Sequence, residues 1–172
     1  MAKAKYTGTG LIASGDYHEV TFKGFTKAGK YIQITILNAV NLGNIDLASV
    51  EKGETVPQIV FTSTYTNTDA LSNSTDEPFE IECEDDTLTG SKAIMLGAGV
   101  ISIDKKEIGL TRGGSQFVVE RTIREINADG DRGPVKDRLT IDRSVPKMTI
   151  NVLEVVNHIA ELYPALKKTT VS

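Results

Sequence analysis

The sequence predicts a mainly β fold, an antiparallel β-sandwich or barrel with one flanking α-helix. Thr, Val and Ile account for 49 of the 172 residues, and β-branched side chains are stiff and pack well on a pleated sheet. Short segments of alternating polar and apolar residues are separated by polar turns, which is typical of antiparallel sheets. A chain of this length suits one domain, residues 1–172.

The first half of the chain predicts a hairpin and three further strands. Residues 17–25 and 31–37 are rich in β-branched and aromatic residues and flank a short polar turn, a combination that favours a hairpin. Strict alternation near residue 80 predicts a strand whose Phe79, Ile81 and Cys83 face the core. The strands after the hairpin are expected at 44–50, 56–66 and 79–84, with a long polar loop at 66–78.

The second half continues with hairpins. A hairpin is expected at 95–110, and a long alternating strand at 115–126 leads into a turn segment at 127–134 that contains Asp-Gly and Gly-Pro. Two more strands are expected, at 136–143 and 147–153, because Pro146 interrupts the pattern between them.

One helix is expected near the C-terminus. Asn157 is a residue type that caps helices, Glu161 suits the first turn, and Pro164 ends the helix because proline lacks a backbone N–H. The tail at 167–172 is expected to be frayed. The apolar residues that recur at helical spacing are Val152, Val155, Val156, Ile159, Leu162 and Tyr163.

Composition argues against several classes of protein. The net charge of −4 does not suit a duplex DNA binder, which usually carries a basic face. One cysteine allows neither an internal disulfide nor a cysteine-rich metal site. No apolar run approaches the ~20 residues that span a bilayer, and the start of the chain lacks the apolar core of a secretion signal. These features indicate a soluble protein from a reducing compartment, with no membrane partner.

The sequence offers no catalytic constellation. His18 and His158 are far apart in the sequence and match no metal-binding spacing, and Cys83 is expected to be buried. The Gly-rich pieces at 8–10 and 97–99 lack the residues of a phosphate-binding loop. Residues 127–131 resemble a calcium loop only faintly, and a turn accounts for them better. We therefore expect no enzyme, no cofactor and no metal site.

Residues 76–86 contain seven acidic residues and no basic residue. Two interpretations remain open for this run. It can be a solvated strand face with its flanking loop, or a surface that repels a polyanion.

Several motifs in the second half follow one another in a recognisable order. Their succession resembles the tail tube (major tail) proteins of tailed bacteriophages and prophages. In that family a short hairpin leads to a Gly-Gly turn, a long strand, a Gly-Pro-type turn, a return strand and a helix. The segments that carry the resemblance are Glu107–Phe117, Arg121–Ile126, Asp129–Gly130, Arg132–Lys136 and Pro146–Ile150.

The two halves resemble the family in swapped order. Residues 15–84 are similar to its C-terminal half. Near the end of this range, Pro78–Ile81 is similar to the Pro-aromatic-Glu-Ile ending of these chains. Residues 95–168 resemble its N-terminal half. We hypothesise a circular permutation, natural or engineered, in which residues 85–94 link the original ends.

The resemblance implies a structural protein of the virion tail, made in the bacterial host cytoplasm. Such proteins form hexameric rings that stack into a hollow tube, and DNA passes through the lumen without specific binding. The resemblance also implies contacts with tape measure, tail terminator and baseplate proteins. A non-polymerising β-sandwich module of a phage particle, such as a capsid decoration or baseplate protein, is the alternative.

Assembly residues are expected in the long second hairpin and in the polar loop. An acidic lumen would keep DNA from adhering. The candidate lumen residues are Gln116, Val118, Glu120, Thr122, Arg124, Lys136, Arg138 and Thr140, and the candidate inter-ring loop residues are Asp129, Gly130, Asp131, Arg132, Asp69 and Asn73.

Overall fold

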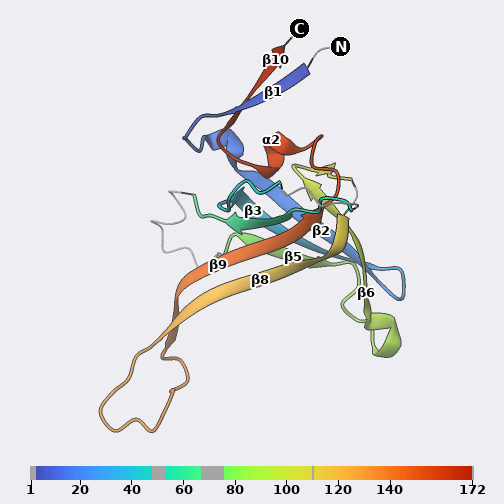
Figure 1. The fold of residues 1–172 in the computed structure, drawn as a ribbon. Coiled ribbons are helices and arrows are strands. Elements are labelled where there is room, and N and C mark those ends of the chain that lie inside the picture. Colours follow the sequence, from blue (N-terminus) through green and yellow to red (C-terminus); the bar gives the residue numbers. More distant parts are fainter. Residues whose placement is uncertain (1–2, 48–52, 67–75, 110, 172) are drawn as a thin grey trace.

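A computed structural model of the chain describes residues 3–47, 53–66, 76–109 and 111–171. Over these residues the fold is mainly β, with antiparallel sheets and one short α-helix (Figure 1), which confirms the predicted fold class. The strands are β1 (Lys3–Gly8), β2 (His18–Thr26), β3 (Tyr31–Asn41), β4 (Gln58–Ser63), β5 (Phe79–Cys83), β6 (Met95–Ile103), β7 (Lys106–Glu107), β8 (Thr111–Glu125), β9 (Leu139–Val152) and β10 (Leu166–Val171). The α-helix is α2 (Ile159–Leu162), and short 3-10 turns are η1 (Ser14–Asp16) and η2 (Gly90–Ala93).

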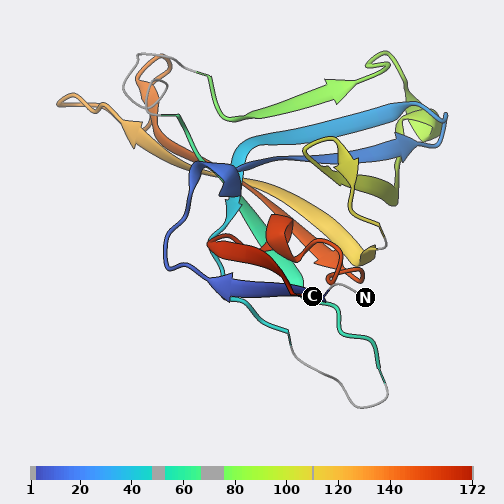
Figure 2. The same ribbon diagram turned by 90° about the horizontal axis from the view of Figure 1, so that it is seen from above.

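Eight strands form one bent sheet in the order β7-β6-β2-β3-β4-β9-β8, with β5 also paired to β3. The bend occurs in β3, which pairs with β5 at residues 32–36 and with β4 at residues 39–41. Between these stretches Asn38 adopts a left-handed conformation with φ of 47°, which Asn tolerates better than most residues. Figure 2 shows the resulting two layers, a first layer of β5, β3, β2 and β6 and a second layer of β4, β9 and β8.

The hydrophobic core lies between these layers, because the inward residues of each strand alternate with outward polar ones. Val20 and Ile36 come from the first layer, Phe61 and Ile150 from the second, and all four are fully buried. The segment around α2 adds Leu162 and Tyr163. Burying a large apolar side chain stabilises the fold by about 1.5–3 kcal/mol.

Both predicted tight hairpins are present. β2 and β3 pair antiparallel from Phe25↔Tyr31 onward, and β6 and β7 pair at Ile103↔Lys106. In β4 alternate residues point into the core, since Ile59, Phe61 and Ser63 are buried. The Ser63 hydroxyl is satisfied by the carbonyl oxygens of Leu37 and Pro78.

Four strand predictions are wrong in their bounds. Residues 44–47 form no strand, and residues 48–50 lie outside the described residues. The strand predicted at 56–66 is shorter in the structure, where β4 covers Gln58–Ser63. The strands predicted on either side of Pro146 are one strand, β9. Within the described residues, the pairing of β4 with β9 ends at Thr62↔Lys147. Pro146 therefore has no partner on the β4 side that would need the backbone N–H that proline lacks.

The helix prediction is correct in place and wrong in extent. α2 has four residues, its N-cap is His158 rather than Asn157, and Val156 is 79% exposed. Val152 belongs to β9 instead. The helical spacing is misleading because Val152 ends a strand, Val155 and Val156 precede the helix, and only Ile159 and Leu162 lie within it.

Two further predictions fail at the edges of the fold. The tail is not frayed, because β10 pairs with β1 from Gly8↔Leu166 to Lys3↔Val171. Cys83 is exposed rather than buried, and Ile81 is 55% exposed. β5 extends past the core, so Phe79 alone of its three predicted inward residues packs against it.

Candidate assembly surface

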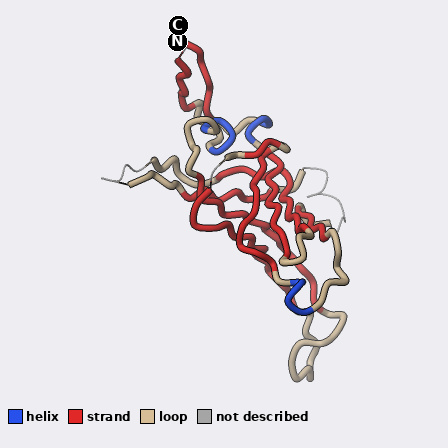
Figure 3. Tube along the Cα trace, turned by 90° about the vertical axis from the view of Figure 1, so that its right-hand side faces the viewer, coloured by secondary structure: helices blue, strands red, loops and turns tan. Residues whose placement is uncertain are grey.

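The β8–β9 hairpin extends well beyond the core. Near its base Phe117 pairs with the buried Met148, and the strands continue outward to Glu125↔Leu139. Figures 1 and 3 show the outer part projecting from the body of the molecule. We call residues 122–142 the arm.

One face of the arm is largely apolar, with Glu125 opposite Leu139 at its outer end. Residues 117, 119 and 121 of β8 lie opposite the buried side chains of Met148, Pro146 and Ser144, so this face continues the core side of the sheet. Ile123 and Ile141 lie directly opposite each other on the same face, as cross-strand partners do. Ile123, Leu139 and Ile141 form the arm stripe and are 57%, 52% and 50% exposed.

A β-bulge makes this arrangement possible. The register runs Thr122↔Arg143 and then Ile123↔Ile141, so Asp142 is the extra residue. Without the bulge, Asp142 would lie opposite Ile123, and the aliphatic pair would not form. Arg124 Nε donates a hydrogen bond to Asp142 Oδ1 at 3.1 Å and holds the extra residue in place.

The base of the arm is fixed to the first layer by an ion pair. Arg121 donates two hydrogen bonds to Glu77, one of them from Nε to Oε1 at 2.9 Å. The Glu77 side chain is only 17% exposed, and the bond from Arg121 lowers the pKa of that carboxyl. Beside this pair, the rings of Phe79 and Phe117 lie 5.5 Å apart. The contacts tie β5 to the middle of β8.

The predicted lumen residues fall into two groups. Lys136 and Arg138 do not lie in a strand, because Asp137 has a positive φ of 66° and the chain turns there before β9 begins. The other six are exposed and, by register, share the face of the hairpin opposite the arm stripe. They are Gln116, Val118, Glu120, Thr122, Arg124 and Thr140.

This face is not acidic. Lys147 Nζ contacts Glu120 Oε2 at 2.7 Å, and Arg124 contacts Asp142. Arg143 lies opposite Thr122 on the same face. Three bases and two acids therefore meet here, and the expected acidic lumen does not match this surface.

The predicted inter-ring residues 129–132 lie in the loop at the tip of the arm. Asp131 Oδ2 orders this loop by accepting hydrogen bonds from Ala128 N at 2.7 Å and from Arg138 Nη1 at 2.9 Å. Asp69 and Asn73 lie outside the described residues.

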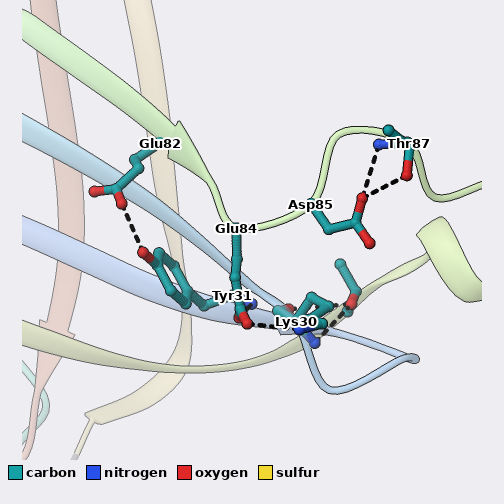
Figure 4. Close-up of polar contacts among 7 residues, drawn as sticks. Lys30, Tyr31, Glu82, Glu84, Asp85 and Thr87 are labelled. Atoms are coloured by element: carbon teal, nitrogen blue, oxygen red, sulfur yellow. Dashed lines mark hydrogen bonds and ion pairs between the residues drawn. The ribbon is translucent and has the colours of Figure 1, made fainter.

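The outward face of the first layer carries exposed acids. Glu80 and Glu82 of β5 pair with Thr35 and Gln33 of β3, and both glutamates are exposed. Tyr31 donates its hydroxyl to Glu82 Oε1 at 2.6 Å (Figure 4), and this bond raises the pKa of the tyrosine.

Part of the acidic run is neutralised. Lys30 Nζ contacts Glu84 Oε1 at 2.8 Å, and this bond lowers the pKa of Glu84 (Figure 4). Asp85 accepts hydrogen bonds from the backbone and hydroxyl of Thr87, which lower its pKa. Asp85 therefore keeps its negative charge, and Lys30 balances Glu84. Glu80 and Glu82 remain exposed on β5, on the same face as Lys23 of β2.

A second projecting element is the ribbon formed by β1 and β10. Its register places Lys3, Lys5 and Lys167 on one face, and Tyr6 with Lys168 on the other. The Lys168 ammonium lies 5.9 Å from the centre of the Tyr6 ring. Nearly all of the ribbon is exposed. Sequence patterns missed it because neither strand has a buried face, so neither shows an alternation of apolar and polar residues.

Each of the two histidines lies near a carboxylate, and the buried Nδ1 of His158 makes no hydrogen bond within the described residues. His18 Nδ1 lies 2.7 Å from Asp104 Oδ2, and the buried His158 lies 3.4 Å from Glu161. Across the described ranges, no three His, Cys, Asp or Glu side chains are grouped so that they could hold a metal ion. No helix in the described part of the chain has the length and apolar character needed to cross a membrane.

Comparisons with protein-family models, curated proteins and solved structures found no match.

Proposed function

We propose that this protein is a structural subunit whose copies assemble into rings, and that the rings stack into a hollow tube through which DNA passes. The observation that carries the proposal is the arm, a hairpin that extends beyond its own core with an apolar stripe toward solvent. Contiguous exposed apolar residues with a polar rim mark surfaces that other protein covers.

The resemblance to tail tube proteins supplies the finer part of the proposal. It implies rings of six copies in a virion tail assembled in the bacterial cytoplasm. It further implies contacts with tape measure, tail terminator and baseplate proteins. The bent antiparallel fold with a short helix at one end is compatible with that family.

Free passage of DNA requires a lumen wall that does not attract phosphate. The outward face of the β8–β9 hairpin carries Arg124, Arg143 and Lys147 beside Glu120 and Asp142. The outward face of the first layer carries Glu80 and Glu82 beside Lys23. Both faces therefore carry mixed charge, and charge alone favours neither as the lumen wall.

The circular permutation is compatible with the geometry. Glu84 N donates to Tyr31 O, and Lys27 N donates to Ile94 O, so both ends of the 85–94 link lie beside the turn of the β2–β3 hairpin. At the other junction, Lys3 lies opposite Val171. A short turn would join β10 to β1 as an ordinary hairpin.

Mass in solution tests the proposal against the non-polymerising alternative. Light scattering after size exclusion should show a species of about six times the 18.6 kDa chain mass, or larger stacks, growing with concentration. A single species of one chain mass at every concentration would contradict assembly and favour a module that binds elsewhere on the particle.

A further inference from the structure

We propose that β1 of one copy adds to the outer edge of β5 in a second copy, as an antiparallel strand. This inference rests on the proposed self-assembly and identifies a contact that would produce it. Strand addition requires two unpaired edges, and its specificity comes from side chains that match across them.

Both edges are available within the part of the chain that the structure describes. There, β1 pairs with β10 alone and β5 pairs with β3 alone. A two-stranded ribbon is only marginally stable by itself in water. The ribbon therefore gains stability by joining a larger sheet.

Charge fixes one register. Glu80 and Glu82 are two residues apart on one face of β5, and Lys3 and Lys5 are two residues apart on one face of β1. Residues spaced in this way are about 7 Å apart in any strand. An antiparallel addition places Lys3 opposite Glu82 and Lys5 opposite Glu80. Shifting by two residues would use Glu84, which Lys30 already occupies.

The opposite face matches in the same register. Ala4 comes opposite Ile81, and Tyr6 comes opposite Phe79. Ile81 is 55% exposed in the single chain, and an aromatic and a small apolar side chain would cover it. One register therefore pairs opposite charges on one face and apolar side chains on the other.

The two edges cannot meet within one chain. Figures 1 and 2 show the ribbon and β5 on different sides of the body. The contact is therefore heterologous, from ribbon to β5 of the next copy, and such contacts close into rings or continue as filaments. Overall charge favours it as well. The ribbon holds four lysines and no acid, so with a total of −4 the rest of the chain carries −8.

A charge-swap experiment tests the contact. The variants are Lys3→Glu/Lys5→Glu and Glu80→Lys/Glu82→Lys, with Lys27→Glu/Lys105→Glu as a control for net charge at exposed sites outside the arm, the ribbon and β5. Sedimentation velocity gives the concentration at which half of each protein is assembled. We expect each swapped variant alone to need roughly tenfold more protein or higher, because two attractive pairs become repulsive. Mixing the two swapped variants should restore association, and the control should match the unchanged protein.

The outcomes separate this contact from self-assembly in general. If the unchanged protein and the swapped variants assemble equally well, β1 does not add to β5, and another edge such as that of β6 forms the contact. The same conclusion follows if the mixture fails to recover while each variant keeps its far-ultraviolet circular dichroism. If the unchanged protein never assembles, the proposed function fails and this contact fails with it.

Discussion

Glu77 and Arg121 join two parts of the chain that are 44 residues apart, through paired hydrogen bonds at the base of the arm. Glu77 precedes β5 and Arg121 lies in the middle of β8. The carboxylate is largely shielded from solvent while the guanidinium is 42% exposed. This pair sets the point at which the core ends and the arm begins.

Removing the guanidinium should destabilise the fold. Arg121→Ala leaves the shielded Glu77 carboxylate without its donor, which should cost about 1–3 kcal/mol in the free energy of unfolding. Urea denaturation measures the loss. The control is Arg124→Ala, whose pair with Asp142 is exposed on both sides and should contribute less than about 1 kcal/mol. Equal losses in the two variants would show that the Glu77 pair has no special role.

The same pair predicts a pH dependence. The folded pKa of Glu77 lies below its usual 4.5, so the folded state favours the ionised carboxylate. Its contribution to stability is complete above the unfolded pKa and is lost as the pH falls through the folded pKa. Denaturation of the unchanged protein and of Glu77→Gln, from pH 6 to pH 3, should show their difference narrowing below about pH 4.5. A constant difference over this range contradicts the assignment.

Gly99 in β6 should be intolerant of any side chain. A Cβ there would lie 2.8 Å from the carbonyl oxygen of Lys23 and against the ring of Phe22, so the strand must shift. Gly99→Ala should lower the free energy of unfolding by about 1–3 kcal/mol. Gly15→Ala is the control, because its Cβ would meet nothing within 4 Å. Similar stability of both variants would contradict the close packing of β6 on β2.

The arm stripe should matter for assembly and little for folding. Ile123→Ser/Ile141→Ser removes exposed side chains, so the free energy of unfolding should change by about 0.5 kcal/mol or less. Self-association, followed by sedimentation, should fall sharply. Val156→Ser, at another exposed apolar position, should leave association unchanged. Unaltered assembly of the double variant would exclude the arm stripe from the interface.

The order of the two halves can be reversed experimentally. A chain that starts at Met95, joins residue 172 to residue 1 through a short turn and ends at Glu84 should adopt the same fold. The junctions at Lys3↔Val171 and beside the β2–β3 turn leave the core pairings intact. Circular dichroism and thermal melting measure the outcome. Loss of cooperative unfolding would count against the permutation.

Local sequence patterns predict the strands that have one buried apolar face and one exposed polar face. The β2–β3 hairpin and the inward residues Ile59 and Phe61 follow from alternation and turn residues. Alternation failed at Cys83 because it predicts which residues share a face and not whether a second layer covers that face. The β1–β10 pairing joins the two ends of the chain and has no local signal.

The candidate site was predicted only in part. The long hairpin and its polar tip were expected from Gly-Gly, Asp-Gly and Gly-Pro turns. The arm stripe depends on the bulge at Asp142, which shifts the register of β9 by one residue. A bulge of this kind depends on cross-strand pairing and leaves no clear pattern in either strand alone. The Glu77–Arg121 pair likewise depends on tertiary packing.

Negative-stain electron microscopy of the purified protein tests the central claim most directly. We predict six-fold rings, or stacks of such rings, with a stain-filled central hole. A field of uniform single-chain particles, at concentrations where sedimentation also shows one chain mass, would contradict it.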